Sequence, residues 1–316
     1  MEDASKFKKQ SFNKNSVRIG LYRPFTKQIL YFDKSFNWSR YQLPALFPNV
    51  DLENLLICVS GDGTTKDFSV VLANSIPNRH FLDTGQCFPL YYYEERQKQT
   101  RRLFDEAGDS EYIRRDGISD FILERAKKQY GNNVTKEDIF YYVYGFLHNS
   151  DYCLRFASDL KKMLPRIPLV EEPKDFWAFS KAGRQLAELH IGYESVAPAK
   201  GVKVTGAEAK FFKVEKLRFP SKNDKSKIIY NSKIAIENIP AEAYEYVVNG
   251  KSAIEWVMER YQVTINKDSG IKNDPNDWAE EVGNPRYILD LLLSIINVSL
   301  ETMKIVKGLP ALKIEG

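Results

Sequence analysis

The spacing of apolar residues divides the chain into regions of different character. Between residue 17 and about residue 95, turn sequences such as GDG and IPNRH separate the short apolar runs VRIGLY, QILYF, LLICVS, FSVVLA and CFPLYYYE. Runs of β-branched and aromatic residues bounded by Gly, Pro and Asn are typical of strands. We therefore predict a β-rich subdomain over residues 17–97.

The next region, residues 98–199, changes to the spacing of a helix. Thr135 and Asp138 predict a capping box, and the apolar residues after them recur on one face: Ile139, Tyr142, Val143, Phe146 and Leu147. A second helix is predicted from Ser150 to the sequence PRIP, with an inward face of Cys153, Phe156, Ala157, Leu160 and Leu164. This region is expected to form a helical subdomain.

In the last region, residues 200–316, apolar residues first recur at every second position, which is the spacing of a strand. The sequence KIIYNSKIAIEN places Ile228, Tyr230, Ile234 and Ile236 on one face, and the polar sequence PSKNDKS connects it to AKFFKVEKLRF. This pattern predicts a β-hairpin with Lys222 and Lys225 at its tip. Two helices follow, within KSAIEWVMERY and NPRYILDLLLSIINVSLETMKIV. The predicted fold class is α+β, with a β-rich N-terminal part, a helical block, a β-hairpin and C-terminal helices.

Length and composition indicate a folded protein without a membrane partner. The 316 residues are enough for two modest cores, and 43% of them are apolar. The three cysteines are far apart, residues 1–16 form a basic lead without a signal-peptide pattern, and no apolar run reaches the length of a membrane span. We expect a cytoplasmic protein with free thiols.

Positive charge is concentrated in two zones of the chain. Residues 1–40 contain nine Lys and Arg against three acids, and residues 200–233 contain ten against three, although the net charge is only +4. Clustered cations attract a polyanion by Coulomb forces and counterion release. The alternative is a solvated lysine-rich surface.

Two sequences resemble nucleotide or methyltransferase motifs without matching them. NPRY, from Asn284 to Tyr287, differs from the NPPY of amino-methyltransferases by Arg286, and is predicted to be a helix N-terminus. SGDGTTKD, residues 60–67, lacks the spacing of a phosphate-binding Walker A loop and is predicted to be a turn.

The remaining candidates for catalysis or metal binding also have simpler interpretations. His190 continues an apolar helix face and is predicted to be a core residue, whereas His148 is expected to favour the end of its helix as a cation. His80 remains a weak contact candidate. Glu172 and Lys174 have the spacing of a nuclease acid and lysine, but Pro173 is unfavourable in a strand. We assign no catalytic residue, no metal site and no cofactor to this chain.

The chain nevertheless resembles a known family in six ordered blocks between about Ser16 and Leu309. These are YRPFTKQILYFDKSF, GQCFPLYYYE, DIFYYVYGFLH with RFASDLKKMLPRIP, FWAFSKAGRQLAELHIGYE, YNSKIAIENIP with AYEYVVNGKSAIEWVMERYQV, and DSGIKNDPNDW with NPRYILDLLLSIINVSLETMKIV. They resemble the C-terminal specificity region of type ISP restriction-modification enzymes, single polypeptides with nuclease, helicase-like ATPase and adenine methyltransferase modules.

The resemblance implies a target-recognition domain that binds double-stranded DNA and has no catalysis of its own. Residues 17–97 then become the DNA-recognition subdomain, and residues 1–16 either a basic lead or the tail of the methyltransferase. The partners implied are DNA and the methyltransferase and helicase modules of the same polypeptide. S-adenosylmethionine, ATP and Mg²⁺ are expected in those other modules.

Cations interleaved with aromatic residues are the candidates for DNA contact, with Arg reading bases and Lys positioning phosphates. The candidates are Arg23, Lys27, Arg40, Lys66, Arg79, Lys181, Arg184, Lys222, Lys225 and Lys227. Two alternatives stay open at this point. One is a scaffold that only docks the other modules, and the other is a minimal metal-dependent nuclease.

Overall fold

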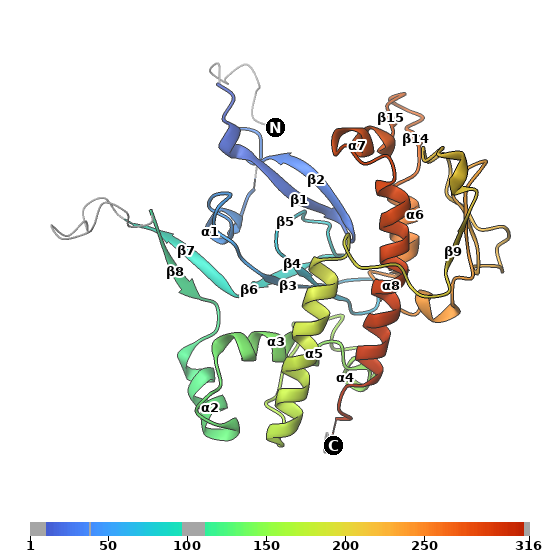
Figure 1. Ribbon diagram of the computed structural model, residues 1–316. Helices are drawn as coiled ribbons and strands as arrows, with labels where there is room; N and C mark the ends of the chain where they lie inside the picture. Colours follow the sequence, from blue (N-terminus) through green and yellow to red (C-terminus); the bar gives the residue numbers. More distant parts are fainter. Residues whose placement is uncertain (1–10, 38, 97–110, 313–316) are drawn as a thin grey trace.

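The computed structural model describes residues 11–37, 39–96 and 111–312 (Figure 1). Most of the basic lead, and the predicted boundary between residues 97 and 98, lie outside these residues. A 3₁₀ turn, η2 (Lys14–Ser16), precedes the first sheet, whose strand order is β2-β1-β5. Its strands are β1 (Val17–Arg23), β2 (Thr26–Tyr31) and β5 (Ile76–Pro77), with β1 antiparallel to β2 and parallel to β5.

A second sheet lies at the centre of the molecule, in the strand order β4-β3-β6. It consists of β3 (Leu56–Val59), β4 (Val70–Ala73) and β6 (Gln86–Pro89), and β3 is antiparallel to both neighbours. The short helix α1 (Leu43–Leu46) precedes it. The predicted strands of the N-terminal part are therefore confirmed.

The predicted helical block begins later than expected and contains a strand. β7 (Tyr91–Glu95) pairs with β8 (Tyr112–Asp116) in an antiparallel ribbon, and the first helix begins only at Asp120. The helices are α2 (Asp120–Tyr130), α3 (Lys136–Phe146), α4 (Ser150–Arg155) and α5 (Pro173–Ile191). The predicted capping box of α3 is confirmed, because the Thr135 hydroxyl accepts from the Asp138 amide and the Asp138 carboxylate accepts from Thr135 N–H.

The prediction that α4 continues to PRIP is wrong. The helix ends at Arg155, and turns replace it up to Met163. This segment instead contacts the loop between β3 and β4. Gly63 N–H donates to the Lys161 carbonyl at 3.0 Å, and Lys161 pairs with Asp67 at 3.0 Å. These long-range contacts override a local sequence that favours a helix.

The predicted hairpin of the last region exists only in reduced form. Single bridges join Arg218 to Ile229 and Ser221 to Asp224, and no strand forms over residues 211–217. The side chains of Asn231 and Asn276 instead make hydrogen bonds to the backbone of this segment. Asn231 donates to the carbonyls of Phe211 and Lys213 at 2.9 Å each, and Asn276 bonds to the backbone of Val214. The predicted apolar face is confirmed, since Ile228, Tyr230, Ile234 and Ile236 are all buried.

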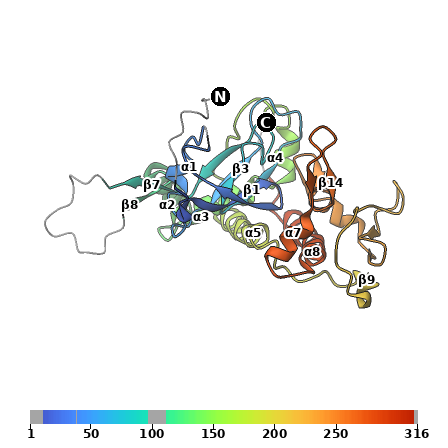
Figure 2. The ribbon, with the colours of Figure 1, turned by 90° about the horizontal axis from the view of Figure 1, so that it is seen from above.

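Small strands and helices complete the C-terminal part. β11 (Ala235–Glu237) lies between β10 (Ile228–Ile229) and β9 (Lys203–Thr205). Two further pairs are β12 (Val247–Val248) with β13 (Lys251–Ser252), and β14 (Thr264–Ile265) with β15 (Lys272–Asn273). The helices are η4 (Ala207–Ala209), η5 (Ala241–Tyr244), α6 (Ala253–Arg260), α7 (Pro275–Glu281) and α8 (Tyr287–Lys307). Figure 2 shows this part and the β7–β8 ribbon at opposite ends of the molecule.

The central sheet separates two apolar cores. Alternate residues of β3 and β4 point to opposite faces, and both faces are covered. One face joins a core shared with the first sheet and with the C-terminal helices, through Leu56, Cys58, Val71 and Ala73. The other face joins a core with the helical block, through Ile57, Val59, Val70 and Leu72.

Candidate nucleic-acid interface

An open hollow lies on the N-terminal part, between the segment 39–46 and the segment 77–87. Its cavity volume is about 720 Å³. The floor is apolar and includes Leu46, Cys58, Phe81 and Leu82. The rim is exposed and mostly polar, and consists of Ser39, Tyr41, Gln42, Asn78, Arg79 and Gln86. We refer to these residues as the hollow and its rim.

The loop after β5 forms one side of the rim. Asn78 N–H donates to the Leu21 carbonyl at 2.8 Å, and the Asn78 side chain accepts from His80 N–H at 2.9 Å, which fixes an Asx turn. Phe81 and Leu82 then enter the core. The turn therefore leaves Arg79 exposed between two anchored points.

The segment before α1 forms the opposite side. Ser39 and Tyr41 have φ angles of 60° and 48°, in the left-handed region that residues with a side chain rarely adopt. The Tyr41 ring is 73% exposed and lines the hollow. A strained backbone that presents an exposed aromatic ring is typical of a functional surface.

Three rim side chains are available for an external ligand. Within the described residues, the side chains of Gln42, Arg79 and Gln86 make no hydrogen bond or ion pair, and all three residues are exposed. An unpaired guanidinium beside amide groups offers donors and acceptors together.

The structure places two more of the predicted DNA-contact residues near the hollow. The Arg23 guanidinium lies 3.4 Å from the Asn78 side-chain oxygen and 4.2 Å from the centre of the Tyr22 ring. Arg40 lies between the rim residues Ser39 and Tyr41, with its guanidinium 5.3 Å from the Phe32 ring. Lys66 is exposed, and its side chain packs beside Gly250 in the turn between β12 and β13.

Four other candidates are held in ion pairs within the chain. Lys27 pairs with Glu194, Arg184 with Asp138 at 2.8 Å, Lys225 with Glu255 at 2.8 Å and Lys227 with Glu237 at 2.6 Å. Lys225 therefore lies against α6 instead of projecting from a hairpin tip. Lys181, on α5, and Lys222, in the 221–224 turn, are exposed and make no ion pair with any described residue.

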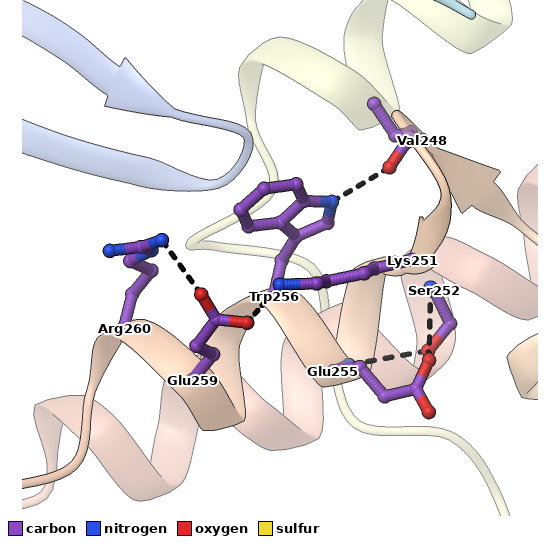
Figure 3. A network of polar contacts seen from close by, with 7 residues as sticks. All are labelled: Val248, Lys251, Ser252, Glu255, Trp256, Glu259 and Arg260. Carbon is purple, nitrogen blue, oxygen red and sulfur yellow. Dashed lines mark hydrogen bonds and ion pairs between the residues drawn. The ribbon is translucent and has the colours of Figure 1, made fainter. Parts of the chain in front are cut away.

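A cluster of cations that the sequence did not single out lies where the tip of the β1–β2 hairpin meets α6 (Figure 3). Lys251 and Arg260 both pair with Glu259, at 2.7 Å for Arg260, and both lie over the Trp256 ring. The Trp256 indole donates to the Val248 carbonyl at 2.7 Å. Glu259 neutralises one of the two positive charges, and the shared ion pairs and ring contacts hold this cluster at the junction between the hairpin and α6.

Comparison with known proteins identifies the family. Residues 1–291 match the family model described as the Type ISP C-terminal specificity domain. The chain belongs to this family. No curated protein matches the chain.

Three solved structures contain a similar fold. An ATP-dependent Type ISP restriction-modification enzyme, LlaBIII bound to DNA, is 35% identical with a TM-score of 0.85, over 98% of this chain and 19% of that chain. A nuclease-deletion mutant of the Type ISP enzyme LlaGI, in complex with a DNA substrate mimic, is 37% identical with a TM-score of 0.80, over 97% of this chain and 22% of that chain. The DrdV–DNA complex is 32% identical with a TM-score of 0.79, over 96% of this chain and 29% of that chain. The specificity domain thus spans less than a third of each of these chains.

His190 is buried and His148 is partly buried, and both rings pack against Tyr144. His190 is a core residue as predicted: Tyr144 and Thr302 contact its two ring nitrogens, and the Tyr246 ring stacks on it at 5.0 Å. The expectation that His148 is a cation is wrong, because burial lowers its pKa to about 4. The helix-end position is favourable for a charge, but desolvation outweighs it.

The motifs set aside in the sequence lie in simple structural contexts. Glu172 and Pro173 begin helix α5, and Gly63 lies in a turn with a φ of 78°. Asn284 precedes α8 and accepts from Arg286 N–H at 2.9 Å, so the helix begins slightly later than predicted. In the described part of the specificity domain, no cluster of three or more His, Cys, Asp or Glu could hold a metal ion, and no helix is long and apolar enough to cross a membrane.

Proposed function

We propose that this specificity domain binds double-stranded DNA and reads the target sequence of a Type ISP restriction-modification enzyme. Family membership supports the proposal, as do three similar solved chains that are described as complexes with DNA or a DNA substrate mimic. The hollow and its rim are the part of the surface that we assign to base reading.

The chemistry of the rim is the observation that supports this assignment most directly. Arg reads guanine through two hydrogen bonds in the major groove, and Asn or Gln reads adenine in the same way. The rim gathers Arg79 with Gln42, Asn78 and Gln86, and three of these four side chains have no partner among the described residues. Groups that are already paired lose an interaction when they bind DNA, whereas these do not.

The cations next to the hollow are assigned to the phosphates. Arg23 and Arg40 lie close enough to the rim to contact a backbone whose bases the rim reads. Lys66, exposed beside Gly250, is a further phosphate candidate. Lys181 and Lys222 remain phosphate candidates at other places on the surface. Lys27, Arg184, Lys225 and Lys227 are weaker candidates, because each must first give up an ion pair.

In this proposal the specificity domain performs no catalysis. Methylation of adenine, ATP hydrolysis and DNA cleavage belong to other modules of a larger polypeptide, which use S-adenosylmethionine, ATP and Mg²⁺. The proposed place of action is the cytoplasm. The specificity domain determines where those modules act.

A docking role for the helical block is a second proposal, supported by a separate groove. The segment after α4 forms an apolar groove of about 610 Å³ that includes Phe156, Met163 and Leu164, and the nearby Leu154 side chain is 76% exposed. Exposed apolar surface of this kind is typical of contacts between protein modules. This role is compatible with DNA binding by the hollow.

Binding to a random-sequence duplex as a function of salt tests whether the domain binds DNA at all. We expect the logarithm of the association constant to fall linearly with the logarithm of salt concentration, with a slope of about −0.9 for each phosphate neutralised. Arg40→Ala should reduce the slope, whereas the control Arg125→Ala, on the exposed face of α2, should not. No binding at low salt would support a docking scaffold instead.

A further inference from the structure

Two cysteines face each other in the floor of the hollow. Cys58 on β3 and Cys87 on β6 are direct partners in the antiparallel register, and their sulfur atoms are 3.1 Å apart. Cys58 is 1% exposed, whereas Cys87 is half-buried and accessible from the hollow. The third cysteine, Cys153, donates to the Leu147 carbonyl in the helical block.

The geometry of this pair is compatible with a disulfide. Directly opposite residues of antiparallel strands have Cα atoms about 4.5 to 5.5 Å apart, and disulfides require about 4.4 to 6.8 Å. The sulfur atoms must approach by about 1 Å to reach the bonded distance of about 2.05 Å. Rotation of the two side chains can supply this movement without a change in the register of the strands.

The environments of the two thiols give them different chemical roles. A hydrogen bond from the Cys58 thiol lowers the pKa of Cys87, and burial raises the pKa of Cys58. The thiolate is the nucleophile in thiol oxidation, so Cys87 reacts first. Cys58 lies within contact distance to react second.

We propose that Cys58 and Cys87 form a redox-active dithiol that a hydroperoxide oxidises to a reversible disulfide. The Cys87 thiolate attacks one oxygen of hydrogen peroxide, and the hydroxide that leaves takes up a proton, which gives a sulfenic acid and water. The Cys58 sulfur then attacks the Cys87 sulfur and releases the second water. Two thiols lose two electrons and two protons in total, and one peroxide is reduced to two waters.

The position of the pair links this chemistry to the hollow. The rim residue Gln86 directly precedes Cys87 on β6. A disulfide from Cys87 to β3 therefore restrains the strand that carries Gln86. Any consequence for DNA reading rests on the proposed function. The oxidation itself does not, because it is measured without DNA.

Mapping the thiols of the full chain after limited treatment with hydrogen peroxide tests the proposal. Remaining thiols are alkylated, the chain is digested, and the peptides are identified by mass spectrometry. We expect loss of two of the three thiols, a linked Cys58–Cys87 peptide pair that is lighter by two hydrogen atoms, and recovery of both thiols with dithiothreitol. Three free thiols after treatment would overturn the proposal, as would Cys87 oxidised beyond the sulfenic acid while Cys58 stays free.

Two variants separate the roles of the cysteines. Cys153→Ser retains the pair and should behave like the unchanged chain. Cys58→Ser removes the second thiol, so dimedone should trap Cys87 as a sulfenic acid. If Cys58→Ser does not fold, the peptide maps of the unchanged chain and of Cys153→Ser still show whether Cys58 and Cys87 form a disulfide.

Discussion

Arg79 is the single side chain on which the base-reading proposal can be tested most sharply. It is exposed, it lines the hollow, and it makes no ion pair among the described residues. The sequence alone identified it as an arginine in a β connection beside His80. It did not indicate Gln42 or Gln86, because a single uncharged amide adds nothing to a charge pattern and belongs to no motif in this sequence.

We expect Arg79→Ala to reduce discrimination between the target duplex and the same duplex with one changed base pair. The loss should be about 1–3 kcal/mol, or roughly 5- to 150-fold, confined to the position that Arg79 reads. Competition binding with a set of single-base variants measures it. Arg125→Ala serves as the control and should leave discrimination unchanged. An equal loss of affinity for every duplex would make Arg79 a phosphate contact.

The packed rings of His148 and His190 predict a dependence of stability on pH. Burial lowers the pKa of His148 to about 4 and lowers that of His190, which also faces the ring of His148 at 5.6 Å. In the unfolded chain both titrate near their ordinary value of about 6.5. Between these values the unfolded state binds more protons than the folded state, so the free energy of unfolding falls as pH falls.

We expect each histidine to account for about 1 kcal/mol of this loss between pH 7 and pH 5.5. Urea unfolding of His190→Gln and of His80→Gln, at both pH values, isolates the effect from the titration of carboxylates. His190→Gln should show a smaller pH dependence than the unchanged chain, and His80→Gln, at an exposed position, is the reference substitution. Identical pH dependence in all three chains would contradict neutral burial of His190.

At the scale of elements, the backbones of α3 and α5 approach each other closely. A Cβ atom on Gly145 would lie 2.2 Å from the Phe179 carbonyl oxygen, and one on Gly183 would lie 1.9 Å from the Tyr141 carbonyl oxygen. The helical spacing of the sequence predicted both helices. It did not predict that glycines let their backbones touch, because that depends on which helix faces which.

Gly145→Ala and Gly183→Ala should each lower the free energy of unfolding by about 1–3 kcal/mol or more, because the added methyl group forces the helices apart. Gly308→Ala is the matched control, since its φ of −91° suits alanine and its nearest neighbour is 3.4 Å away. Urea midpoints at constant slope measure the differences. Equal midpoints for Gly145→Ala and Gly308→Ala would show that α3 and α5 are not tightly packed.

Local signals predicted some elements correctly and failed where distant contacts decide. The Thr135–Asp138 capping box and the face of Ile228 and Tyr230 are local patterns, and both are confirmed. The early end of α4 and the reduced hairpin depend on partners far along the chain, including Asn276 for the backbone of Val214. A single sequence contains no signal for such pairings.

At the scale of the whole molecule, the central sheet explains why three regions of the chain fold together. The apolar runs LLICVS and FSVVLA lack alternation, which is typical of strands buried on both faces. The structure shows which regions cover each face: the helical block on one, the first sheet and the C-terminal helices on the other. The sequence could predict burial, but not these partners.

The same arrangement gathers the rim from segments that are about 40 residues apart, so the candidate site could be predicted only in part. Three sequence candidates, Arg23, Arg40 and Arg79, lie on or near the hollow, and four others are in ion pairs. The sequence showed the basic zone of residues 1–40, but Glu194, the partner of Lys27, is 167 residues away.

Selection of bound duplexes from a random-sequence library, followed by sequencing, tests the central proposal most directly. The unchanged chain and the rim variant Arg79→Ala with Gln86→Ala are compared at two salt concentrations. We predict that the unchanged chain enriches one asymmetric motif that persists at the higher salt, and that the rim variant loses preference at defined positions while it still binds DNA. Binding that disappears with salt and enriches no motif would contradict sequence reading by this domain.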